Sequence, residues 1–179
     1  MTAHAERATA PTAPALDIAA ELRGVIDRRW SELASITEQE SAVRPAPGKW
    51  SARQIIGHLI DSAVNNTPRF VNGQREEELV FPTYDQDAWV EHQRYQERTW
   101  RPLLELWRGV NVHLATLIEG IPATILTRPR TRHNLDQIAW QTVPASTPTT
   151  LEYLARDYVG HLRHHLAQID SLITAQRRR

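Results

Sequence analysis

The sequence LEYLARDYVGHLRHHLAQIDSLITAQ, residues 151–176, repeats apolar side chains at steps of three and four positions. This spacing predicts a long amphipathic helix with one broad apolar face. The face comprises Leu151, Leu154, Ala155, Tyr158, Val159, Leu162, Leu166, Ile169, Leu172 and Ile173. Thr149, with Glu152 three residues later, predicts a capping box at the start of the helix. A helix with such a face must pack against other elements to bury it.

Three other stretches of the chain show the same periodicity. The first runs from Leu16 to about residue 44 and predicts one long helix. The second opens at Ser51, where Gln54 completes a capping box. Pro102 divides the third into a short helix and a long helix over about 101–119, since proline interrupts a helix interior. With the last helix, these predict an all-α fold, a four-helix bundle.

The remaining segments predict irregular structure. Residues 121–148 contain four prolines and predict a long loop before the last helix, with room for a short hairpin. Residues 1–15 are rich in Ala, Thr and Pro and predict a disordered N-terminal segment. Residues 16–176 then form a single domain, which is long enough to bury a core of its own.

The composition excludes several classes of function. The chain has 179 residues, 21 Lys and Arg against 21 Asp and Glu, and no cysteine. Without a basic excess, nucleic-acid binding is not expected. No apolar run approaches the roughly 20 residues that span a bilayer, so we expect no membrane association and a cytoplasmic protein. Because thiolate ligands are absent, any metal must be bound by nitrogen and oxygen, and the eight histidines are the obvious source.

Two of these histidines share the inward face of the last helix. His161 and His165 lie four residues apart, with His165 inside the apolar arc and His161 just beyond its edge. His164 projects well outside that arc. Two imidazoles one turn apart can hold one transition metal, although such a pair alone is more often structural or exposed. The pair also needs a third ligand.

The second helix offers a candidate for that ligand. His58 lies on a polar stripe with Gln54, Asp61, Ser62 and Asn65, and this stripe could equally be a solvated face. The other histidines are weaker candidates. His113 follows the apolar pattern of its helix only loosely, His133 in the long loop could reach the mouth of a site or face water, and His4 and His92 are expected at the surface.

Three stretches of the chain resemble the DinB-like superfamily. Residues 48–62, GKWSARQIIGHLIDS, resemble its opening motif, and residues 84–89, YDQDAW, match a second motif of its YfiT branch. Residues 158–169, YVGHLRHHLAQI, are similar to the closing histidine-rich helix of that branch. Members of the branch include bacillithiol transferases and proteins labelled as metal-dependent hydrolases. The resemblance covers roughly residues 16–174.

This resemblance implies a four-helix bundle that binds one divalent transition metal, Zn or Ni, through His58, His161 and His165. It also implies a homodimer. The chain departs from the branch at Gln168, where the branch often has another histidine, and in the segment 134–148, which is longer than usual.

Three functions follow as hypotheses. In the first, the metal activates a low-molecular-weight thiol, such as bacillithiol or mycothiol, for attack on an electrophile, which makes the protein an S-transferase. In the second, hydroxide replaces the thiolate, which makes it a hydrolase. In the third, the bundle binds metal under stress without catalysis. In the two enzymes Asp61 would accept a proton, and Gln54 and Asp157 would orient imidazole N–H groups, unless these three are simply solvated.

Overall fold

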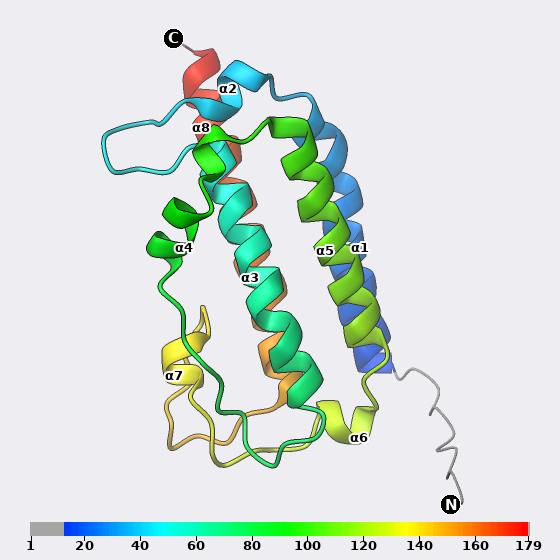
Figure 1. Cartoon of the computed structure of the whole chain (residues 1–179). Helices are drawn as coiled ribbons and strands as arrows, with labels where there is room; N and C mark the ends of the chain where they lie inside the picture. The colour runs from blue at the N-terminus through cyan, green and yellow to red at the C-terminus, as the bar shows by residue number, and fades with distance from the viewer. Residues whose placement is uncertain (1–12, 179) are drawn as a thin grey trace, which may run out of the picture.

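The computed structural model describes residues 13–178 and shows four long helices in a bundle (Figure 1). The elements are α1 (Ala13–Ala34), α2 (Glu38–Ala42), α3 (Ala52–Asn72), α4 (Gln86–His92), η1 (Tyr95–Glu97), α5 (Trp100–Glu119), α6 (Ala123–Leu126), α7 (Leu135–Ile138) and α8 (Leu151–Arg177). Helix α1 packs against α5 and α8, and α3 packs against the same two helices. The predicted all-α four-helix bundle is therefore confirmed. Within residues 13–178 no helix is long and apolar enough to cross a membrane.

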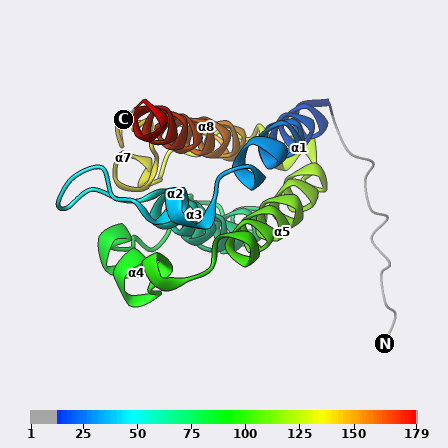
Figure 2. The same ribbon diagram turned by 90° about the horizontal axis from the view of Figure 1, so that it is seen from above.

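The short helices α4 and α7 lie on one side of this bundle. In both views α4 and α7 lie beside α3 and α8, away from α1 and α5 (Figures 1 and 2). Helices α3 and α8 thus carry an additional layer of loops and short helices, whereas α2 and α6 lie at the two ends of the bundle.

The first predicted helix is wrong in its length, because the chain breaks between α1 and α2. The Thr37 hydroxyl accepts a hydrogen bond from the Glu40 N–H at 3.1 Å, and the Glu40 carboxylate accepts one from the Thr37 N–H at 2.8 Å. This capping box starts a new helix. The carbonyl of Leu33 at the end of α1 accepts the indole N–H of Trp100 at 2.9 Å, so a tertiary contact satisfies it. Helix α1 also begins at Ala13, inside the segment expected to be disordered, whose residues 1–12 lie outside the described residues.

The two predicted capping boxes have different outcomes. The box at Ser51 is confirmed, because the Ser51 hydroxyl accepts from the Gln54 N–H and the Gln54 side chain accepts from the Ser51 N–H. The box at the start of α8 is wrong. Thr150 caps this helix, accepting from the N–H of Tyr153 at 3.0 Å, and Glu152 pairs with Arg156. The cap therefore lies one residue later than the sequence pattern indicates.

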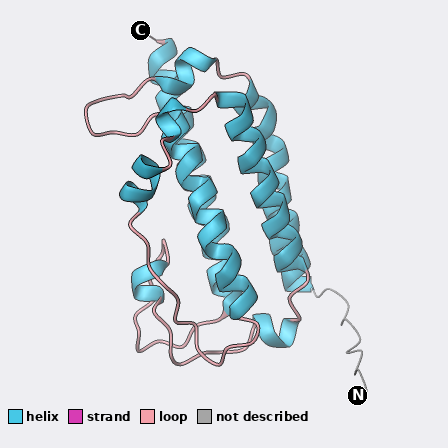
Figure 3. Cartoon of the chain, viewed as in Figure 1, coloured by secondary structure: helices cyan, strands magenta, loops and turns pink. Residues whose placement is uncertain are grey.

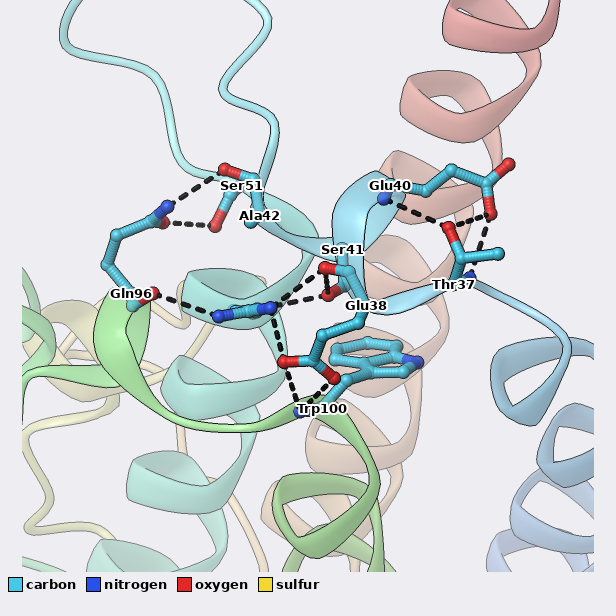
Figure 4. Close-up of polar contacts among 9 residues, drawn as sticks. Thr37, Glu38, Glu40, Ser41, Ala42, Ser51, Gln96 and Trp100 are labelled. Atoms are coloured by element: carbon cyan, nitrogen blue, oxygen red, sulfur yellow. Dashed lines mark hydrogen bonds and ion pairs between the residues drawn. The ribbon is translucent and has the colours of Figure 1, made fainter.

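A polar network links α2 to the starts of α3 and α5 (Figure 4). The Glu38 carboxylate accepts the N–H of Trp100 at 3.0 Å and pairs with the guanidinium of Arg53, which is 8% exposed. Arg53 also donates to the Ser41 hydroxyl at 3.0 Å, and Gln96 accepts from the hydroxyl of Ser51 at 2.6 Å. The network anchors the first turn of α3, and with it the position of the histidine that follows on that helix.

The long loop contains no hairpin. Residues 121–148 form two short helices, α6 and α7, and the described residues hold only isolated bridges, Leu79 with His133 and Arg130 with Thr149 (Figure 3). His133 is 6% exposed, and both of its ring nitrogens have partners. Its Nε2 lies 2.8 Å from the Thr147 carbonyl and its Nδ1 accepts the N–H of Leu135 at 3.1 Å. His133 therefore holds the loop together and neither faces water nor lines the cavity described below.

Candidate metal centre

Three histidines from two helices meet at one point between α3 and α8. His58 comes from the middle of α3, and His161 and His165 lie one turn apart on α8. Each offers a ring nitrogen, and these nitrogens lie within 4.8 Å of one another. The Nε2 atoms of His58 and His161 are 3.2 Å apart. Two nitrogen ligands at about 2.0–2.1 Å from one metal are roughly 2.9–3.4 Å apart, so this spacing fits a shared ion.

Burial keeps the three imidazoles neutral. Loss of solvation, with a smaller contribution from His165, lowers the pKa of His58 to about 3. Burial, with smaller contributions from the neighbouring histidines, lowers the pKa of His161 to about 2. The pKa of His165 is also lowered by burial, against a smaller opposing effect from Gln168. Neutral imidazole is the form that binds a metal ion.

Gln168 orients one of the three rings. Its Oε1 lies 2.8 Å from Nδ1 of His165, which assigns the N–H to Nδ1 and leaves the lone pair of Nε2 free. Its Nε2 lies 3.0 Å from Nε2 of His164, which is exposed. In the sequence, Gln168 is a departure from the YfiT branch. The contact could still have been predicted, because Gln168 lies three residues after His165 on the same helix.

The three other predicted site residues form their hydrogen bonds outside the cluster. Asp61 accepts from the Tyr95 hydroxyl at 2.6 Å and from Gln93 on the same oxygen, Oδ1. Gln54 accepts from the N–H of Ser51 in the cap. Asp157 accepts the backbone N–H of Trp140 at 2.9 Å and of Gln141 at 2.7 Å. None of these bonds orients an imidazole, because every partner is a residue outside the three-histidine cluster.

A cavity of about 510 Å³ opens from the histidines along α3 and α8. One wall is formed by α3 and another by α8, and residues 137–140 and Thr83, Tyr84 and Gln86 close the sides. Trp140 lies against α8 at Gly160, where an added Cβ would come within 3.0 Å of its ring. Ser62, Asn66 and Arg69 continue the wall from His58, a role that the helical spacing in the sequence could have indicated.

Asp61 should make stability depend on pH. Burial raises its pKa to about 6, against the opposing hydrogen bonds from Tyr95 and Gln93. Because the folded pKa lies above the unfolded one, Asp61 favours the folded state at low pH, and this contribution is lost as the pH rises from about 4 to 6. Between pH 4 and pH 7, the free energy of unfolding of Asp61→Asn should therefore rise relative to that of wild type by on the order of 2 kcal/mol. Urea unfolding of both proteins at the two pH values measures this, and an equal difference at both would refute it.

The chain is similar in sequence to a known protein family and to several of its members. Residues 21–169 match the family model described as the DinB superfamily. The chain is 26% identical over 153 residues to a protein of Geobacillus thermodenitrificans named "Putative metal-dependent hydrolase", covering 86% of this chain and 80% of that one. It is 27% identical over 125 residues to the YfiT protein of Bacillus subtilis, which bears the same description, covering 70% and 65%.

The fold agrees with that sequence match. The solved structure of Bacillus subtilis YfiT, described as an unusual four-helix bundle topology, superimposes with a TM-score of 0.65 at 22% identity. The superposition covers 91% of this chain and 83% of that one. The fold and the site thus define a class of protein, a helical bundle with a three-histidine cluster. The chain belongs to the DinB superfamily.

Proposed function

We propose that the protein is a metal-dependent enzyme that activates a low-molecular-weight thiol for attack on an electrophile, an S-transferase. The observation that carries the proposal is the meeting of three neutral imidazoles at the end of an open cavity. His58, His161 and His165 would hold the ion, and three nitrogen ligands are typical of a catalytic site, which keeps a position open. A bound Zn or Ni ion supplies Lewis-acid chemistry and lowers the pKa of a thiol or water.

The carboxylates favour a thiol over water as the nucleophile. Hydrolysis at such a centre commonly uses a carboxylate as general base. The one carboxylate among the cavity-lining residues, Asp157, is held by two backbone N–H groups, and Asp61 does not line the cavity. A thiol needs less help, since it loses its proton more readily than water. The protein brings no cysteine of its own, so the thiol must come with the substrate.

A metal-dependent hydrolase is the second candidate. It is supported by the printed descriptions of the similar proteins from Geobacillus thermodenitrificans and Bacillus subtilis. In this case a water molecule takes the place of the thiol in the cavity, and the same three histidines serve.

A thiol panel separates the two candidates. Protein loaded with Zn or Ni is mixed with a chromogenic electrophile, with and without added cysteine, bacillithiol or mycothiol, and turnover is followed by absorbance. We expect turnover that rises with thiol concentration in wild type and falls at least about 100-fold in His165→Ala. His113→Ala, at an exposed histidine of α5 that does not line the cavity, is the control and should retain activity. Turnover that ignores the thiol would favour the hydrolase and end the transferase proposal.

The partners implied are small molecules. We expect a thiol and an electrophile, with no nucleic acid and no membrane, in keeping with the zero net charge of the chain. A cytoplasmic homodimer, which the family resemblance implies, is part of the same proposal. Light scattering at several protein concentrations would test the dimer.

A further inference from the structure

Arg69 is a buried cation without an acidic partner. Its side chain lines the cavity, the residue is 5% exposed, and it forms none of the ion pairs found among residues 13–178. It donates to the Pro82 carbonyl at 3.1 Å and to Oδ1 of Asn66 at 3.4 Å. A guanidinium has five N–H donors, so these two neutral acceptors leave it poorly satisfied.

Among residues 13–178 two other arginines are buried, and both have different hydrogen-bond partners from Arg69. Arg53 pairs with the carboxylate of Glu38. Arg130 has no carboxylate, but its guanidinium donates to three backbone carbonyls, at 2.7, 3.1 and 3.2 Å. Neither residue lines the cavity of the histidine cluster. Arg69 therefore differs from Arg53 in lacking a carboxylate partner, and from both in its access to the site.

The charge of Arg69 is retained despite its burial. Burial lowers its pKa, but arginine starts so high that the guanidinium remains protonated at neutral pH. An unpaired buried charge is costly, and an anion that binds beside it recovers part of that cost. Burial raises the pKa of Tyr84, another cavity residue, to about 12, so its phenol is also protonated.

The position of Arg69 defines the length of a ligand. His58, Ser62, Asn66 and Arg69 follow one another along the same wall of α3. Eleven steps along the helix lead from His58 to Arg69, which is about 16 Å along the axis. Both side chains lean towards the N-terminus of the helix, but the arginine reaches further, which shortens the gap to the order of 10–15 Å. Polar side chains lie between the two ends.

We propose that Arg69 binds a carboxylate of the substrate and so holds its reactive end at the histidine cluster. The second half of this statement rests on the proposed function, and the first does not. A carboxylate fits better than a phosphate dianion, because the cavity offers one guanidinium and also contains the carboxylate of Asp157. A planar carboxylate can accept two parallel N–H bonds from one guanidinium. The substrate class is thus a small carboxylic acid whose reactive group is separated from the carboxyl group by a chain of several carbon atoms.

Matched probes test the carboxylate. Calorimetry compares 6-mercaptohexanoate with 6-mercaptohexanamide, which differ in charge alone, on the Zn-loaded protein. Wild type should prefer the carboxylate at least about tenfold, and Arg69→Gln should lose the preference. Arg163→Gln, which removes an exposed arginine of α8 paired with Glu21, should keep it. Arg69→Lys retains the charge without the planar guanidinium and should keep part of the preference for the carboxylate. Equal affinity of wild type for both probes would overturn the proposal, whatever the variants do.

Two further arms keep this inference separate from the proposed function. Hexanoate and hexanamide lack the thiol, so on metal-free protein they report on Arg69 alone. A preference for hexanoate that Arg69→Gln abolishes supports the carboxylate site even if thiols prove inactive. Thiol-dependent turnover without any preference for the carboxylate overturns the site and leaves the S-transferase standing. Tighter binding of inorganic phosphate than of hexanoate would overturn the choice of carboxylate.

Discussion

His161→Ala is expected to abolish stoichiometric metal binding. The histidine is one of three converging nitrogen donors, and the two that remain lie on different helices with no carboxylate beside them in the described cluster. After loading with Zn or Ni and removal of free ion, wild type should carry about one metal per chain and the variant less than about 0.1. Elemental analysis of both proteins makes the measurement.

The same variant should lose the stabilisation that metal confers. An ion that binds only the folded state at 1,000 times its dissociation constant adds about 4 kcal/mol to the free energy of unfolding. Wild type should therefore melt at a higher temperature when metal is added, and His161→Ala should not. His113→Ala is the control, since His113 is an exposed histidine of α5 outside the cluster. Less than about 0.1 metal per chain in wild type itself would exclude the metal centre.

Turnover distinguishes the enzymes from a non-catalytic bundle. Stoichiometric metal that depends on His161, without activity on any thiol or ester substrate, would favour the metal-binding protein without catalysis. Activity that disappears together with the metal in His161→Ala would exclude it.

Gly57→Ala should be strongly destabilising, although alanine favours helices. A Cβ at Gly57 would lie 2.1 Å from Cδ2 of Tyr95, a buried side chain that cannot move freely. Tyr95 would have to shift and give up its 2.6 Å hydrogen bond to Asp61. Overpacking and the lost bond together should reduce the free energy of unfolding by about 2–4 kcal/mol. Urea denaturation followed by circular dichroism measures the change.

Gly109→Ala provides the control for that substitution. Gly109 lies in the interior of α5, and a Cβ there would meet nothing within 4 Å. This variant should be stabilised by up to about 1 kcal/mol, because alanine loses less backbone entropy in a helix. Equal stability of the two alanine variants would show that Tyr95 does not pack tightly over α3.

Much of the fold could be predicted because its signals are local. Apolar spacing located the four long helices, and the Ser51 box located the start of α3. The break between α1 and α2 also had a local signal, Thr37 followed by Glu40, which the continuing apolar pattern obscured. At α8 two adjacent threonines compete for the cap, and the chain entering from the loop places Thr150 there.

The candidate site was only partly predictable. The helical wheel placed His161 and His165 on a common inward face and His164 outside it, and the structure has the same arrangement. His58 could equally have been solvated on the evidence of periodicity, because its stripe is polar. The structure buries that stripe except for the half-buried Asn65, and His58 is 1% exposed. The engagement of Asp61 by Tyr95 depends on a partner 34 positions away, which no spacing on one helix reveals.

The sequence alone determined what depends on neighbouring residues: which segments are helical, which face of α8 is apolar, and that a metal could be bound only by nitrogen or oxygen. Tertiary structure decided which polar side chains remain available for chemistry. Asp157 is held by two N–H groups of the loop before α8, whereas Arg69 is buried with no carboxylate partner. The reason is physical, since a polar group is available to a ligand only if distant parts of the chain leave its hydrogen bonds or its charge unsatisfied.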